Sequence, residues 1–166
     1  EVTRYIQSSF MLKADNRTVW IHPFRVRPDI VGNDLADLVL ITHPHRDHLD
    51  TRAIAACRKP RAPVVANSAA ASRLSRKKVE AISLWEGEST SVGGIQVTAL
   101  PGYNGLHLRA LKFNVGFRFN LGGATIYHSG DTDAVPEMGE AGPVDVAFLP
   151  IGGSFVMNEE EAARAV

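Results

Sequence analysis

Residues 38–48 read Leu38-Val39-Leu40-Ile41-Thr42-His43-Pro44-His45-Arg46-Asp47-His48. The apolar run that opens this stretch predicts a short strand that is buried on both of its faces. The polar end contains three imidazoles and a carboxylate, which are groups that Zn²⁺ binds at about 2.0–2.2 Å. The stretch therefore predicts a buried strand whose end holds a metal ion.

The histidine spacing directs two side chains to one side of the chain. Residues two apart in an extended segment point the same way, so His43 and His45 should face the same point. Pro44 keeps the preceding residue extended, which favours this arrangement. The alternative is a set of unrelated surface histidines, and the buried strand before them disfavours it. One metal ion can therefore bind His43 and His45.

The polar residues that follow offer a second position. Asp50 can cap a helix that begins at Thr51, so the chain should turn there. Asp47 and His48 lie just before this turn and can bend back toward the first pair. A second ion can bind them, because two ions about 3.5–4 Å apart recur in metal-dependent hydrolases.

Two later loops contain further candidate ligands. Asp131 follows a predicted strand over residues 124–128, and a carboxylate in a tight loop can bridge two ions; an ordinary turn aspartate is the alternative. His107 follows a predicted strand over residues 95–100 and can be the third ligand of the first ion. A solvated loop histidine is the other interpretation of His107, and Asn104 is the competing ligand.

The remaining two histidines are expected to support the ligands. His128 lies inside the predicted strand 124–128, and His22 ends the predicted strand 19–21. Packing in the core, or a hydrogen bond that orients a ligand, is the expected role of each.

The rest of the pattern predicts more strands than helices, mostly paired as hairpins. Gly122-Gly123 is a strong two-residue turn signal, and Asp15-Asn16-Arg17 indicates an earlier turn. Helices are expected after Asp50, after Asn67 or Ser68, and after Asn158. These elements fit a mixed sheet structure with helices on its outer faces. The predicted strands cover residues 5–12, 19–21, 38–42, 63–66, 95–100, 115–121, 124–128 and 144–149.

Composition limits the class of protein. The 166 residues are 45% hydrophobic and 22% charged, which is typical of one folded domain over residues 1–166. The formal net charge of zero argues against nucleic acid or an anionic membrane as a partner. The single cysteine, Cys57, excludes an intrachain disulfide and is expected to be packed and unreactive, which permits a cytoplasmic location. No apolar stretch reaches the length of a membrane span, and the N-terminus does not resemble a signal peptide.

The motif from Thr42 to Asp50 resembles the signature of the metallo-β-lactamase superfamily. Four further segments resemble its branch of zinc-dependent hydrolases that includes ascorbate-phosphate lactonase. These segments are Pro101-Gly102-Tyr103-Asn104, Ile126-Tyr127-His128-Ser129-Gly130-Asp131-Thr132, Phe148-Leu149-Pro150-Ile151-Gly152-Gly153 and Met157-Asn158-Glu159-Glu160-Glu161-Ala162. The resemblance covers essentially the whole chain, and it is far more specific for the superfamily than for a substrate.

The resemblance implies an α+β fold, the αββα sandwich, in which two packed sheets carry helices outside. It implies one metal ion at His43, His45 and a later histidine, here His107. It implies a second ion at Asp47 and His48, with Asp131 bridging the two. A metal-bound hydroxide would attack an ester, lactone or phosphodiester, and Asp47 and Asp131 are the catalytic candidates. Zinc is the expected ion, one or two per chain, with manganese as the alternative.

The chain departs from the family pattern at two places. The family usually has an aspartate where this chain has His22, and a histidine there brings a different charge beside the ligands. The family also continues beyond the helix at Glu159 with a strand and a last histidine ligand, so the sandwich is expected to lack its C-terminal strand and helix. An unfinished sheet edge favours pairing with another copy of the chain.

Two functions fit these expectations. The first is a metal-dependent hydrolase with a small-molecule substrate, because His45 stands where the oxidoreductase branch of the superfamily typically has a glutamate. The second is a non-catalytic or partner-completed binding module of the same fold, which the missing segment supports. A nuclease is disfavoured by the zero net charge.

Overall fold

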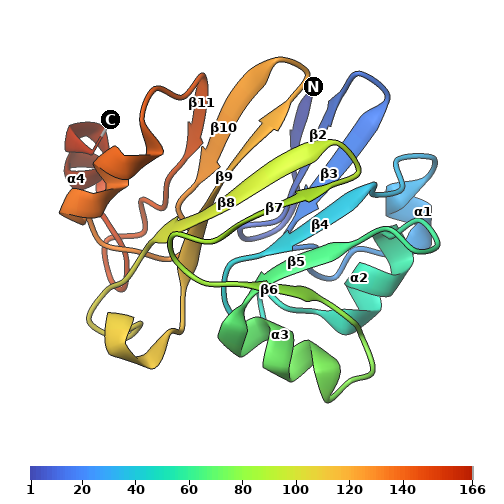
Figure 1. Ribbon diagram of the computed structural model, residues 1–166, viewed down its shortest axis with the longest axis horizontal. Coiled ribbons are helices and arrows are strands. Elements are labelled where there is room, and N and C mark those ends of the chain that lie inside the picture. The colour runs from blue at the N-terminus through green and yellow to red at the C-terminus, as the bar shows by residue number, and fades with distance from the viewer. Residues whose placement is uncertain (166) are drawn as a thin grey trace.

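The computed structural model describes residues 1–165, whose strands form two sheets that pack face to face (Figure 1). The first sheet has six strands in chain order, namely β1 (Val2–Arg4), β2 (Phe10–Ala14), β3 (Arg17–Ile21), β4 (Leu38–Ile41), β5 (Val64–Asn67) and β6 (Ile82–Leu84). The second sheet runs in the order β11, β10, β9, β8, β7. Its strands are β7 (Ser89–Val92), β8 (Ile95–Pro101), β9 (Val115–Leu121), β10 (Ala124–His128) and β11 (Val146–Phe148).

Both sheets are mixed. Antiparallel hairpins join β2 to β3 and β9 to β10, whereas β3, β4, β5 and β6 run parallel to one another and β11 runs parallel to β10. The β9–β10 hairpin turns at Gly122 and Gly123, whose φ angles are 59° and 78°. A tight two-residue hairpin turn requires positive φ at both positions, which is why this glycine pair predicts it well.

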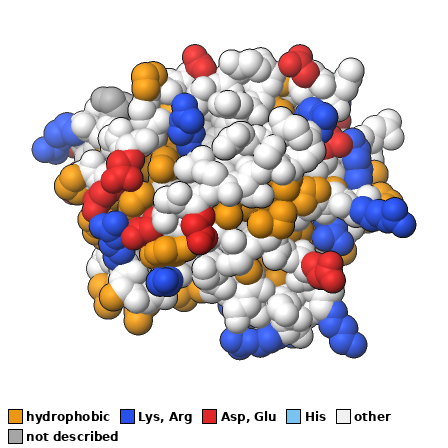
Figure 2. Space-filling view, in the orientation of Figure 1, with side chains coloured by type: hydrophobic (Ala, Val, Ile, Leu, Met, Phe, Trp, Pro, Cys, Tyr) orange, Lys and Arg blue, Asp and Glu red, His pale blue; other side chains and the backbone are white. Residues whose placement is uncertain are grey.

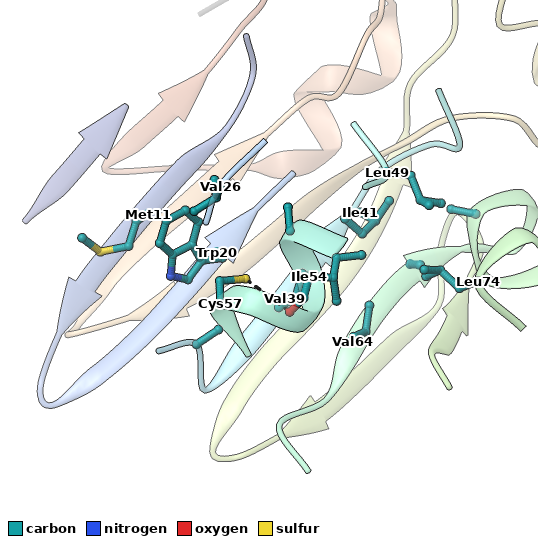
Figure 3. Close-up of a cluster of buried hydrophobic side chains, with 14 of the residues drawn as sticks. Met11, Trp20, Val26, Val39, Ile41, Leu49, Ile54, Cys57, Val64 and Leu74 are labelled. Carbon is teal, nitrogen blue, oxygen red and sulfur yellow. Dashed lines mark hydrogen bonds between the residues drawn. The ribbon is translucent and has the colours of Figure 1, made fainter. Parts of the chain in front are cut away.

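Strand β4 packs against a different layer on each face. Val39 and Ile41 belong to the cluster on the helix side, which Figure 3 shows around Trp20 and Ile54. Leu38 and Leu40 lie in the cluster between the two sheets. All four strand residues are 0% exposed, and each such burial stabilises the fold by about 1.5–3 kcal/mol. The end of β4, where His43 begins, is therefore held from both sides.

Helices cover the first sheet from outside (Figure 1). They are α1 (Pro28–Val31), α2 (Thr51–Cys57) and α3 (Ser68–Ser75). The Asp50 side chain accepts hydrogen bonds from two backbone N–H groups at the start of α2, and Asn67 accepts one at the start of α3. These caps fix where each helix begins, so they also fix the loops that lead into them.

The second sheet is covered by the end of the chain. The 3₁₀ segment η2 (Pro136–Ala141) and helix α4 (Glu159–Arg164) pack on it through a cluster that includes Leu100, Tyr127 and Met157. Asn158 and Glu161 form a capping box at the start of α4, the helix that was expected after Asn158. The layers are therefore helix, sheet, sheet and helix, which is the predicted αββα sandwich.

Several predicted elements differ from the structure in extent. Residues 5–12 do not form one strand, because β2 begins only at Phe10 and the residues before it form a turn in which Gln7 adopts a positive φ of 56°. The strand predicted over residues 144–149 is shortened to β11. Strands β6 and β7 and helix α1 were not predicted from the sequence. Val166, the end of the predicted last helix, lies outside the described residues.

The distribution of surface charges and the environment of the Cys57 thiol agree with the expectations from composition. Acidic and basic side chains are interspersed on the face seen in Figure 2, in keeping with the balanced charge. Cys57 is 0% exposed, and burial raises the pKa of its thiol to about 12, so it is packed and unreactive as predicted. Among residues 1–165, no helix is long and apolar enough to cross a membrane.

Candidate metal centre

All six histidines of the chain gather where the two sheets meet. Three follow the end of β4, His22 directly follows β3, His128 ends β10, and His107 lies in the loop after β8. Their rings are close neighbours, with centroids 4.0 Å apart for His43 and His48 and 4.9 Å apart for His43 and His107. The backbone joins the sheets at the same place, because the Val115 N–H donates to the Thr42 carbonyl at 3.2 Å.

Three of these side chains present nitrogen atoms to one point. The candidate ligand atoms of His43, His45 and His107 lie within 4.8 Å of one another, and His45 Nδ1 is 3.3 Å from His107 Nε2. His43 Nε2 is buried and has no hydrogen-bond partner among residues 1–165. Leaving such a nitrogen unpaired costs about 1–3 kcal/mol, so the lone pair needs a partner at this point.

The loop that carries His107 is organised by Asn104. The Asn104 side-chain oxygen accepts hydrogen bonds from the backbone N–H groups of Leu106 and His107 at 2.8 and 2.6 Å. Its amide nitrogen donates to the carbonyls of Asp131 and Phe155 at 3.2 and 2.8 Å. Asn104 therefore does not compete for the metal position, because both ends of its amide are used to hold His107 in place.

Asp131 and Asp47 lie beside the three nitrogens. The Asp131 carboxylate is 3.5 Å from His43 Nε2 and 3.3 Å from His48 Nε2. Asp47 is 3.6 Å from His48 Nε2, and its side chain is 46% exposed. Asp131 thus lies between the first set of nitrogens and His48, whereas Asp47 stands at the solvent edge.

A second group of imidazoles packs behind the first. His22, His43 and His48 also have candidate ligand atoms within 4.8 Å of one another. Their inward-facing nitrogens are already paired, because Thr42 Oγ1 is 2.9 Å from both His22 Nε2 and His43 Nδ1, and His22 Nδ1 is 3.1 Å from His48 Nδ1. These contacts leave Nε2 of His43 and Nε2 of His48 for other partners, and His48 Nε2 lies beside Asp47 and Asp131.

Burial keeps most of the imidazoles neutral. Burial, followed by the charge of neighbouring imidazoles, lowers the pKa of His22 and of His43 well below the ordinary value. The same two causes lower the pKa of His45, and burial lowers the pKa of His128 to about 4. Neutral imidazole is the form that binds a metal ion, so these residues are ready to do so near neutral pH.

Asp131 remains ionised for a different reason. Burial raises the pKa of its carboxyl group, but the hydrogen bond from His48 and the positive charge that His48 and His43 can carry outweigh this effect. The net result holds the pKa of Asp131 well below its usual range. Three imidazole nitrogens and an ionised carboxylate are a donor set that fits a divalent ion such as zinc.

Comparison with known proteins places this arrangement in a family. Residues 1–166 match the family described as "Beta-lactamase superfamily domain". The chain belongs to this superfamily. Within it, the chain is 34% identical to the UPF0173 metal-dependent hydrolase of Thermococcus kodakarensis, over 98% of this chain and 77% of that protein. It is therefore a member of the UPF0173 metal-dependent hydrolases, which confirms the superfamily that the motif predicted.

Solved structures show the same fold. The metallo hydrolase Igni18 of Ignicoccus hospitalis has a TM-score of 0.81 at 27% identity and covers 99% of this chain and 76% of its own. A crystal structure from Parabacteroides distasonis has a TM-score of 0.82 at 30% identity, over 95% of this chain and 72% of that one. The sandwich of this hydrolase is thus shared with solved members of the superfamily.

The hydrolase has a cleft beside its metal-ligating side chains. The cleft has a volume of about 720 Å³, and its lining includes Asp47, His48 and Asp131. Apolar side chains such as those of Phe10 and Phe148 also line it. A space of this size, with a few polar groups at one wall, is typical of a site for a small molecule.

The structure brings several of the predicted site residues together and shows supporting contacts that the sequence did not indicate. The structure brings His43, His45 and His107 together, with Asp131 and His48 adjacent. It gives Asn104 a structural role, and it shows that the Arg73 guanidinium on α3 donates to the Pro44 carbonyl at 2.6 Å. Nothing in the local sequence pattern around Arg73 indicates this contact.

Proposed function

We propose that this hydrolase cleaves an ester, lactone or phosphodiester bond of a small molecule, with a divalent ion held by His43, His45 and His107. The observation that supports this most is the buried, unpartnered Nε2 of His43 beside two other imidazoles. When bound, such an ion makes water nucleophilic near neutral pH and stabilises negative charge on substrate oxygens. Zinc is the proposed ion and manganese the alternative, since imidazole and carboxylate ligands accommodate both.

Asp131 is proposed to bridge from this position to a second one at Asp47 and His48. Its carboxylate is ionised and lies within 3.5 Å of both His43 Nε2 and His48 Nε2. Asp47 is proposed to accept the proton of the attacking water, because its half-exposed carboxylate can pass a proton on to solvent. The apolar wall of the cleft would hold the body of the substrate against these carboxylates.

The first test replaces a ligand and its neighbour separately. His45→Ala should abolish both metal loading, measured by elemental analysis, and hydrolysis of ester, lactone and phosphodiester substrates. Arg46→Ala changes the adjacent exposed residue and should retain both. Turnover that persists in His45→Ala would exclude this site as the source of activity. A wild-type chain that is fully loaded and inactive on the whole panel would favour the binding module instead.

The second test asks whether activity depends on the charge of the Asp131 carboxylate. Asp131→Asn keeps the size of the side chain but removes its charge, so it should reduce kcat by about 10²-fold or more. Asp133→Asn is the control, because Asp133 is an exposed carboxylate two residues away. Equal effects of the two substitutions would contradict the proposed role of Asp131.

A cytoplasmic location remains part of the proposal. A single buried thiol with a raised pKa suits a reducing compartment and gives no advantage in an oxidising one.

A further inference from the structure

The hydrogen bonds of the His22 ring fix which of its two nitrogens accepts and which carries the proton. The backbone N–H of Thr42, which can only donate, points to His22 Nε2 at 3.0 Å. His22 is 0% exposed, and an imidazole that accepts a hydrogen bond at one nitrogen carries a proton on the other. Because Nε2 accepts, that proton lies on Nδ1. The tautomer of His22 therefore follows from a backbone group that the fold holds in place.

This assignment determines the tautomer of His48. His22 Nδ1 is 3.1 Å from His48 Nδ1, and two nitrogens at this distance need one donor and one acceptor. His22 is the donor, so His48 Nδ1 accepts and the proton of His48 lies on Nε2. That N–H points toward the Asp131 carboxylate at 3.3 Å. A nitrogen that carries a proton has no lone pair to give to a metal ion.

In His43 and His107 the hydrogen bonds place the proton on Nδ1, whereas in His48 they place it on Nε2. The Thr42 hydroxyl is 2.9 Å from both His22 Nε2 and His43 Nδ1. We assign it as a second donor to His22 Nε2, which carries no proton, and as the acceptor from His43 Nδ1. His107 Nδ1 donates to the Asp131 carbonyl at 3.0 Å. In both residues Nε2 is left with a free lone pair, and it faces the first metal position. The fold thus prepares two imidazoles to bind an ion and prepares His48 to donate a hydrogen bond.

We propose that His22 is a positioning residue that limits this chain to one tightly bound ion, at His43, His45 and His107. It does so by holding His48 as a hydrogen-bond donor to Asp131, so a second ion at Asp47 and His48 must first break this hydrogen bond and therefore binds more weakly. A side chain at position 22 that can only accept a hydrogen bond would have the opposite effect. His48 would then carry its proton on Nδ1, and its unprotonated Nε2 could bind a metal ion. The inference rests on the metal centre proposed above.

The tautomers can be read directly by NMR of ¹⁵N-histidine-labelled protein. In the metal-free chain, His22 should be the Nδ1–H form, His48 the Nε2–H form, and His43 and His107 the Nδ1–H form. The His48 assignment should persist after one equivalent of Zn²⁺ is added. A His48 that carries its proton on Nδ1 in either state would overturn the proposal. This measurement uses the unaltered protein, so it does not depend on how any variant folds.

The number of Zn²⁺ ions bound per chain provides the second test of the proposal. Titration calorimetry with Zn²⁺ should give one tight ion for the wild type. His22→Asp presents only acceptors to His48, so it should tighten a second ion by roughly tenfold or more, as changes to the partners of ligands commonly do. His48→Ala added to His22→Asp should remove that second ion again.

The outcomes separate the two proposals. Two equally tight ions in the wild type would overturn the role of His22 and leave the metal centre in place. A wild-type chain that binds no Zn²⁺ would contradict the metal centre itself, and the one-ion inference would fail with it. A His22→Asp variant that is folded by circular dichroism and still binds a single ion would also overturn the role of His22.

Discussion

Gly130 lies directly against Thr42 at the junction of the two sheets. A Cβ atom on Gly130 would come within 3.0 Å of Thr42 Cβ and 2.5 Å of Asn114 Oδ1. The φ angle of Gly130 is also positive, at 67°. The residue before His43 and the residue before Asp131 therefore meet at a distance that only glycine permits, and this contact sets the spacing between the two ligands.

Gly130→Ala should accordingly be costly for both stability and the site. We expect a loss of about 2–5 kcal/mol, from the left-handed backbone and from overpacking together. Urea unfolding gives the free energy, and titration with Zn²⁺ should show a weaker Kd. Gly123→Ala is the control, because Gly123 has φ 78° but no atom within 4 Å of the added Cβ. Its cost should be only about 1–2 kcal/mol, and equal losses would contradict the contact.

Asn104 should matter to metal binding although it is not a ligand. Asn104→Ala removes the acceptor for the His107 N–H and the donor to the Asp131 carbonyl. Because His107 then loses its fixed position, the Kd for Zn²⁺ should rise about 10–100-fold. The matched control is Asn120→Ala, an exposed asparagine on β9. If Asn104→Ala binds Zn²⁺ as tightly as Asn120→Ala, the loop does not depend on Asn104.

The ligands that directly follow β4 could be predicted from the sequence, whereas the position of His107, which depends on contacts distant in the chain, could not. The end of β4 is predictable because an all-apolar run and the ligands that follow it are contiguous. The position of His107 depends on carbonyls of Asp131 and Phe155, which are far away in the chain and contribute no side-chain pattern. Strand β6 has three residues and β7 is mostly polar, so neither shows the alternation that predicts a strand.

Arg73 should support the histidine motif from outside. Its guanidinium donates to the carbonyl of Pro44, which lies between His43 and His45. Arg73→Gln should therefore lower stability by about 1.5–3 kcal/mol, the usual value of a hydrogen bond to a charged group. Metal affinity should fall with it. Arg76→Gln, on the exposed end of the same helix, should change neither quantity, and a matching loss in both variants would show that helix α3 acts as a whole.

Acidification from about pH 6.5 to pH 4 should destabilise the metal-free protein, because buried histidines resist protonation. Burial lowers the pKa of His128 to about 4, compared with 6.5 for an exposed imidazole. Between these values the unfolded chain binds a proton that the folded chain does not, so stability falls as the pH drops from about 6.5 to 4. The loss is on the order of 3 kcal/mol for His128 alone.

The measurement is urea unfolding of the metal-free chain across this pH range. His128→Asn should flatten the slope, although His22 and His43, whose pKa values are also lowered by burial, should keep part of it. The ionised Asp131 does not oppose this trend, because its stabilising effect is lost only at a pH below the ordinary carboxyl pKa. A stability that is constant between pH 6.5 and pH 4 would mean that the histidines are not buried as neutral groups.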